Sequence, residues 1–160
     1  MRKIPVLFLF FAFVLPGLAH AAKEQERNKN VARNFFEEVI GQGKLDQYSE
    51  SHAPGFVAHG ADHDFTLEED MNFAREERKA LPDMRITVKQ MVAEGDRVAV
   101  FWTAAGTNTQ AGAGLPATGK KIAVTGMTLF RFQNGKISEE WGVWDKLSAL
   151  KQAGLIPAQP

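Results

Sequence analysis

The hydrophobic positions of the first half of the chain recur at helical spacing. Val31, Phe35, Phe36, Val39 and Ile40 would all lie on one face of a helix. This pattern predicts an amphipathic helix that ends at Gly41. Thr66 and Glu69 have the spacing of a capping box, which predicts a helix start after Thr66. The predicted helices are 25–40, a short one at 45–50, and 67–81.

The second half alternates between apolar and polar residues, as strands do. After a short strand at 56–59, longer strands are predicted at 84–94, 97–109, 120–132 and 135–145, followed by a closing helix at 147–154. Gly95 and the pair Asn134-Gly135 mark tight turns between them, and the glycines of 110–116 mark a loop. Helices followed by an antiparallel meander predict an α+β domain, in which the helices cover one face of a curved sheet and leave one pocket between the layers.

The N-terminus has the features of an export signal. Arg2 and Lys3 precede an apolar run from Ile4 to Leu15, and Ala19-His20-Ala21 has the small-x-small pattern of a cleavage site. The run is shorter than the roughly 20 residues that a membrane-spanning helix needs. We therefore predict a signal peptide at 1–21, cleaved after Ala21 or Ala22, and one domain at 22–160 in a periplasmic or secreted protein.

Composition excludes several classes of function. Basic and acidic residues are equal at 19 each, so no basic surface for nucleic acid or anionic membranes is expected. The chain contains no cysteine, which rules out disulfides, thiolate metal sites and cysteine nucleophiles. The histidines and aspartates of 59–64 fall in a predicted loop without a distant partner, so no metal site is predicted.

The last predicted strand combines aromatic residues with carboxylates. If its alternation is regular, Ile137, Glu139, Trp141, Val143 and Asp145 share one face. A carboxylate beside an indole on a half-buried face is a candidate general base, because burial raises its pKa. Asp145 is therefore the first candidate for catalysis. The alternative is that Asp145 caps the closing helix.

Other candidates line the same predicted pocket. His59 could donate to a carbonyl or relay a proton, or could be a half-buried histidine with a backbone partner. Trp102 and Asn108 are an even number of residues apart on the same predicted strand, so both side chains could face the pocket. Glu139 lies inside with Asp145 or pairs with a basic residue at the rim. Phe35 forms a pocket wall or part of the core, while His52 and His63 are expected to face solvent.

Several short motifs resemble the SnoaL-like polyketide cyclase (ester cyclase) family, in the family's order and spacing. They are Ala80-Leu81-Pro82-Asp83, 92–99 (Val-Ala-Glu-Gly-Asp-Arg-Val-Ala), Gly106-Thr107, 116–120 (Pro-Ala-Thr-Gly-Lys), Gly135-Lys136-Ile137, Glu139-Glu140-Trp141 and Asp145. The resemblance implies the cone-shaped fold of the nuclear transport factor 2-like superfamily, and a homodimer or higher oligomer. It also implies acid/base chemistry without cofactor or metal, with Asp145 as the acid/base group, Trp141 lining the pocket and His59 on the first short strand. Many members carry histidine where this chain has Asn108.

The expected function is cyclisation or isomerisation of a small apolar carbonyl compound through an enolate. Two alternatives remain open. One is a protein of the same fold that binds a small apolar molecule without turnover, which export would favour. The other is an epoxide or lactone hydrolase with an Asp-activated water and Arg131 or His59 as the acid.

Overall fold

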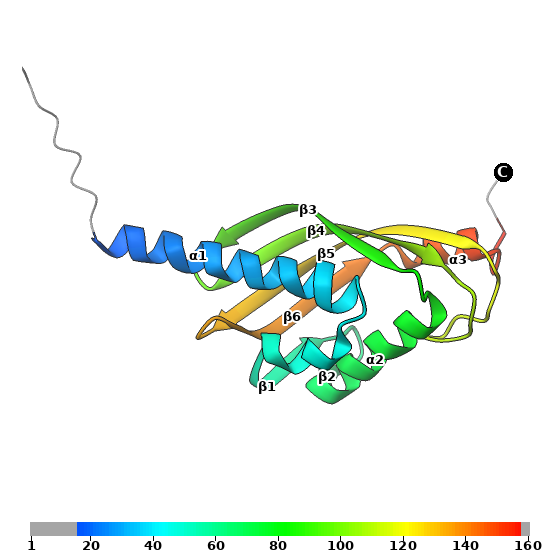
Figure 1. The fold of residues 1–160 in the computed structure, drawn as a ribbon, viewed down its shortest axis with the longest axis horizontal. Helices are drawn as coiled ribbons and strands as arrows, with labels where there is room; N and C mark the ends of the chain where they lie inside the picture. The colour runs from blue at the N-terminus through cyan, green and yellow to red at the C-terminus, as the bar shows by residue number, and fades with distance from the viewer. Residues whose placement is uncertain (1–15, 158–160) are drawn as a thin grey trace, which may run out of the picture.

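The N-terminal helix is longer than its apolar pattern predicts. The computed structural model describes residues 16–157, so most of the predicted signal peptide lies outside the described residues. Helix α1 (Pro16–Asn34) continues into a π-helical segment, η1 (Phe35–Ile40), which ends at Gly41 as predicted. Its first turns project beyond the strands (Figure 1). No helix of the described residues is long and apolar enough to cross a membrane.

The remaining helices lie close to their predicted positions. They are η2 (Leu45–Ser51, a 3-10 helix), α2 (Leu67–Ala80) and α3 (Lys146–Ala153). The capping box before α2 is present, because the Thr66 and Glu69 side chains each bond the other's backbone N–H. Gly154 ends α3 in a left-handed conformation with φ of 74°, which glycine adopts without strain.

Six strands form one mixed sheet in the order β2-β1-β6-β5-β4-β3. They are β1 (His52–His59), β2 (Asp64–Thr66), β3 (Arg85–Glu94), β4 (Arg97–Thr107), β5 (Lys121–Gln133) and β6 (Lys136–Trp144). The β1–β6 pair is parallel and the other pairs are antiparallel. Sequence patterning missed β2 and placed the start of β1 four residues late.

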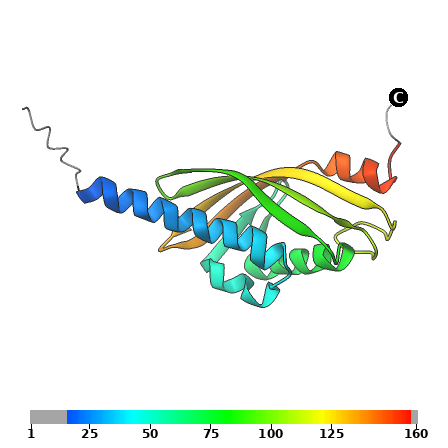
Figure 2. The same cartoon turned by 45° about the horizontal axis from the view of Figure 1, so that its top comes forward.

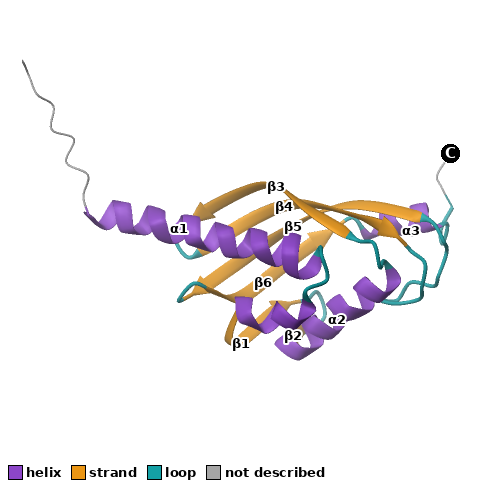
Figure 3. Ribbon diagram, in the orientation of Figure 1, coloured by secondary structure: helices purple, strands orange, loops and turns teal. Residues whose placement is uncertain are grey.

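The helices define an inner and an outer face of the sheet. In two views α1 crosses the curved strands, and α2 lies near β1 and β2 (Figures 2 and 3). The core lies between α1–η1 and the inner face, where Phe35, Phe36, Val98, Val100 and Phe130 are almost fully buried. The predicted α+β architecture, an unclosed curved sheet covered by helices, is confirmed.

A β-bulge makes the predicted alternation of β6 wrong. Arg131 pairs with Glu139, but the next residue of β5 pairs with Ile137, so Ser138 is an extra residue in β6. An extra residue reverses the side-chain phase from that point on. Ile137 is fully buried on the inner face, whereas Glu139, Trp141 and Val143 lie on the outer face. The inner positions beyond the bulge are Glu140 and Gly142.

Candidate functional site

Asp145 lies at the end of β6, outside the inner layer. It is the N-cap of α3, and its carboxylate accepts a hydrogen bond from the Ser148 backbone N–H at 2.8 Å. The residue is exposed. Asp145 therefore caps α3, which is the alternative role considered for it, and its predicted position inside the pocket is wrong.

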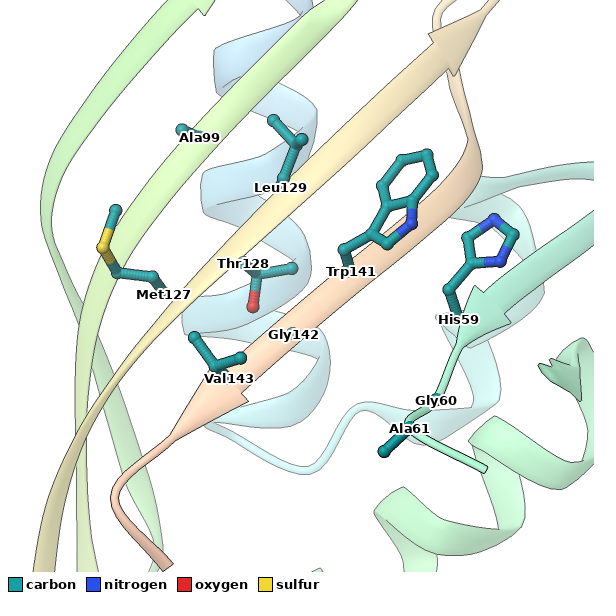
Figure 4. Close-up of a pocket in the computed structure, with 10 residues that line it drawn as sticks. All are labelled: His59, Gly60, Ala61, Ala99, Met127, Thr128, Leu129, Trp141, Gly142 and Val143. Carbon is teal, nitrogen blue, oxygen red and sulfur yellow. The ribbon is translucent and has the colours of Figure 1, made fainter. Parts of the chain in front are cut away.

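Three other predicted site residues do meet, but on the outer face. His59 stacks on Trp141 with ring centroids 4.5 Å apart, and its Nε2 lies 3.1 Å from Glu139 Oε2. The two aromatic rings form one end of a shallow groove of about 430 Å³, which continues along β5 and β6 past Leu129, Met127 and Val143 (Figure 4).

Charged groups hold this outer arrangement in place. The Arg131 guanidinium donates to Glu139 at 2.8 Å and to Asp96 at 2.8 Å, and lowers the pKa of the Glu139 carboxyl. The hydrogen bond to Glu139 is the main reason that the pKa of His59 is raised, and Asp64 contributes through His59 Nδ1 at 3.0 Å. Both ring nitrogens of His59 therefore have carboxylate partners. Glu139 pairs with a basic residue, which is the second of its two predicted alternatives.

Asn108 and Phe35 turn out to be structural residues. Asn108 is fully buried: its side-chain oxygen accepts from the Thr118 N–H and hydroxyl at 3.0 and 2.8 Å, and its amide donates to Gln110 O at 2.9 Å. These bonds close the loop between β4 and β5. Phe35 is 1% exposed and packs edge-on against Tyr48 and Phe130. Neither side chain reaches an open surface, so their predicted roles in substrate binding are not supported.

The prediction that His52 faces solvent is wrong. This residue is 3% exposed rather than solvent-facing, and its ring stacks on Tyr48 at 5.0 Å. Nδ1 donates to Tyr48 O at 2.8 Å, and burial lowers the pKa of His52 to about 4. His52 is therefore a neutral core histidine at physiological pH. Exposed His63 agrees with its prediction.

The inner face instead carries a group of carboxylates that the sequence analysis did not single out. Glu140 projects from β6, and Asp70 and Glu77 project from α2. Tyr48 donates its hydroxyl hydrogen to Asp70 Oδ2 at 2.5 Å. All three carboxyl residues are only partly exposed to solvent, whereas Tyr48 is 2% exposed. We call Asp70, Glu77 and Glu140 the inner carboxylates.

Burial raises the pKa of each inner carboxylate. The pKa of Glu140 rises to about 8, first because of burial and then because of the negative charges of Asp70 and Glu77. Burial and the charge of Asp70 raise the pKa of Glu77 to about 7. Burial also raises the pKa of Asp70, although the hydrogen bond from Tyr48 opposes this. Glu140 and Glu77 thus exchange protons near neutral pH, which general acid/base chemistry requires.

Trp102, a predicted site residue, is linked through Thr128 to the surroundings of Glu140. Its indole Nε1–H donates to the Thr128 hydroxyl at 3.1 Å. Thr128 faces inward directly opposite Gly142, in register between β5 and β6. A Cβ placed on Gly142 would lie 3.6 Å from Glu140 Oε1, so the carboxyl group lies beside this glycine.

One signal could have pointed to two of the three inner carboxylates. Asp70 and Glu77 are seven residues apart and flank buried Ala74, so both lie on the covered side of α2. Glu140 was hidden by the bulge, because regular alternation assigns it to the face opposite Ile137. Within residues 16–157, no three His, Asp or Glu side chains are placed to hold a metal ion.

Comparison with known proteins agrees with this fold. AclR from Streptomyces galilaeus, assigned as a hydroxylase, is 24% identical, with a TM-score of 0.78 over 85% of this chain and 86% of that one. IdmH from Streptomyces antibioticus, assigned as a polyketide cyclase, is 28% identical, with a TM-score of 0.69 over 79% of this chain and 98% of that one. A protein from Jannaschia sp. CCS1, assigned as a SnoaL-like polyketide cyclase, is 23% identical, with a TM-score of 0.74 over 83% and 95%.

A one-sided helical layer on a curved mixed sheet is the architecture of nuclear transport factor 2-like proteins. The profile of the SnoaL-like polyketide cyclases matches residues 30–153, and the chain belongs to that family. Family and fold together support a cyclase- or isomerase-type function. No functionally curated protein matches the sequence significantly.

Proposed function

We propose that this protein catalyses cyclisation or isomerisation of a small apolar carbonyl compound by cofactor-free acid/base chemistry, with Glu140 as the group that moves the proton. The observation that carries the proposal is the position of Glu140. It lies on the inner face, keeps solvent contact, and has a pKa near 8 beside two further carboxylates. Membership of the SnoaL-like family supports the reaction type.

The chemistry follows from a carboxyl group that exchanges its proton near neutral pH. Ionised Glu140 would take a proton from the carbon next to a carbonyl, and the bonding electrons would move onto the carbonyl oxygen to give an enolate. Protonated Glu140 would then return the proton to another carbon, which isomerises the compound. Alternatively, the enolate carbon attacks a second carbonyl of the same molecule, and Glu140 protonates the new alkoxide.

Burial explains why Glu140 suits this role better than Asp145. A carboxylate with a raised pKa is a stronger base than one in water, and it still ionises appreciably at pH 7 to 8. Asp145 is exposed, and one of its oxygens is occupied as a helix cap. The indole of Trp102, which is only partly buried, would provide an apolar contact for the substrate.

The test is hydrogen–deuterium exchange at the α-carbon of a panel of 1,3-dicarbonyl compounds and cyclic ketones, followed by NMR in D₂O. We expect exchange above the buffer rate for the wild type and for Asp145→Asn, and none for Glu140→Gln. Glu140→Gln keeps the shape of the protonated acid, so a loss of folding is not expected. Equal exchange by Glu140→Gln and wild type would overturn the proposal, as would loss of exchange in Asp145→Asn alone. Binding of a panel compound without any exchange would instead favour the non-catalytic binding protein.

We also propose that the protein forms a homodimer through the outer face of the sheet. Phe101, Met127 and Val143 are 39, 51 and 72% exposed there, which is unusual for apolar side chains on a sheet. A two-fold contact between two copies would cover this face on both. Light scattering is expected to give a dimer for the wild type and a monomer for Met127→Glu. A monomeric wild type at micromolar concentration would contradict this.

We propose that the protein is exported, because its N-terminal sequence has the pattern of a signal peptide. In the described part, the side chains from Ala19 to Glu24 are exposed, and the first buried side chain of α1 is Asn28. Cleavage after Ala21 or Ala22 would therefore remove no described contact of the core.

A further inference from the structure

The inner face has an unfilled position in front of Gly142. Apart from the neighbouring residues of β6, a Cβ at this glycine would have two described heavy atoms within 4 Å, namely Glu140 Oε1 at 3.6 Å and Thr128 Oγ1 at 3.7 Å. Both distances are ordinary van der Waals contacts. A ligand carbon placed there would therefore touch the carboxyl group on one side and the hydroxyl group on the other.

The hydroxyl of Thr128 is oriented by Trp102. The Trp102 indole lies across Gly126, where any Cβ would be 2.2 Å from the ring atom Cζ2, and its Nε1–H donates to Thr128 Oγ1 at 3.1 Å. This bond occupies a lone pair of the hydroxyl oxygen, so the hydroxyl hydrogen must point elsewhere.

Among the described residues, the hydroxyl hydrogen of Thr128 has no acceptor. Thr128 is only 3% exposed, and no group within residues 16–157 accepts a hydrogen bond from it. A buried donor without an acceptor is unfavourable, so the site gains from a ligand that supplies an oxygen. This observation is independent of the inner carboxylates, and it points to a carbonyl oxygen as the ligand group.

We propose that Thr128 donates a hydrogen bond to the carbonyl oxygen of the substrate while the carbon next to that carbonyl lies over Gly142, within reach of Glu140. This inference rests on the proposed function and adds the position of the reacting atoms. As Glu140 removes the α-proton, negative charge collects on the oxygen that Thr128 contacts, so the hydrogen bond strengthens in the transition state. Trp102 is a positioning residue that fixes the direction of the hydroxyl. The substrate class is a carbonyl compound with a planar apolar part that packs against the indole.

Four variants separate this inference from the proposed function. Thr128→Val removes the hydroxyl at nearly constant shape, Thr128→Ser keeps it, Gly142→Ala fills the open position, and Glu140→Gln removes the base. The alanine methyl would meet its neighbours at 3.6 and 3.7 Å, so Gly142→Ala is expected to fold. Each variant is measured by α-carbon exchange and by calorimetric binding of 1-nitro-2-naphthol, a planar aromatic compound whose acidic enol-type hydroxyl is ionised at pH 7. At this pH Glu140 is still mostly protonated, so the naphtholate can bind beside it.

We expect Thr128→Val to slow exchange about 100-fold, within the range known for single oxyanion donors, and to weaken naphtholate binding about 10-fold. Thr128→Ser should stay within threefold of the wild type in both measurements. Gly142→Ala should abolish binding, whereas Glu140→Gln should abolish exchange and retain naphtholate binding. A Trp102→Phe variant should lower the exchange rate more than it raises the half-saturating substrate concentration, because it misdirects the hydroxyl without removing it.

These variants distinguish a failure of this inference from a failure of the proposed function. If Glu140→Gln stops exchange but Thr128→Val matches the wild type in both measurements, this inference is wrong and the proposed function stands. If Glu140→Gln exchanges like the wild type, the proposed function fails, and the binding of naphtholate by Thr128→Val decides the position of the oxygen by itself. A wild type that does not bind naphtholate would overturn the inference directly.

Discussion

Replacement of Glu140 by glutamine should stabilise the fold, and increasingly so as the pH rises. In the folded protein the pKa of Glu140 is raised from 4.5 to about 8, so the fold favours the protonated form. The stability linked to this group is therefore fully present below pH 4.5 and is lost as the pH rises through 8. Glutamine resembles the protonated acid and cannot ionise, so the variant avoids that loss.

The size of the effect follows from the pKa difference. The folded pKa of about 8 and the unfolded pKa of 4.5, at about 1.36 kcal/mol for each tenfold change in acidity, give an upper bound of about 5 kcal/mol above pH 8. Solvent contact of Glu140 and reprotonation of Asp70 and Glu77 lower this value. We expect the variant to be about 2–4 kcal/mol more stable than the wild type at pH 8.5, and to differ from it by at most about 1 kcal/mol at pH 5.

Urea unfolding at several pH values between 5 and 9 measures this difference directly. Asp145→Asn is the matched control: asparagine caps helices as well as aspartate does, so its effect should be small and should not grow with pH. A difference between Glu140→Gln and wild type that stays constant from pH 5 to 9 would refute the reasoning. Such a result would mean that Glu140 ionises normally and is not part of a buried carboxylate group.

Three further predictions concern other parts of the chain. Asn108→Ala should cost about 2–3 kcal/mol in urea unfolding, because it removes the buried amide of Asn108 and leaves the half-buried Thr118 donors unpaired; a neutral effect would contradict the structural role. An NMR titration of His59 should give a pKa above 6.5 that falls in Glu139→Gln, since the main acceptor loses its charge; an unchanged value would count against the pair. The mass of the exported protein should correspond to cleavage after Ala21 or Ala22, and the full-length mass would exclude it.

Most of the architecture was predictable because it depends on local periodicity. Val31, Phe35 and Val39 mark one face of a helix whatever they pack against, and the Thr66–Glu69 capping box depends on neighbours three residues apart. The short strand β2 was missed because three residues carry too little alternation to be recognised. The sequence therefore determined the fold class and the order of nearly all its elements.

The identity of the site residues was decided by tertiary structure. One extra residue at Ser138 moved Glu139 and Trp141 to the outer face and brought Glu140 inward, and such a bulge arises from pairing with β5 and β1, which lie far away in the sequence. The raised pKa of Glu140 likewise needs burial and the charges of Asp70 and Glu77, which α2 brings to β6. A sequence determines which side chains are available, whereas burial and proximity, which set their chemistry, exist only after distant segments have packed together.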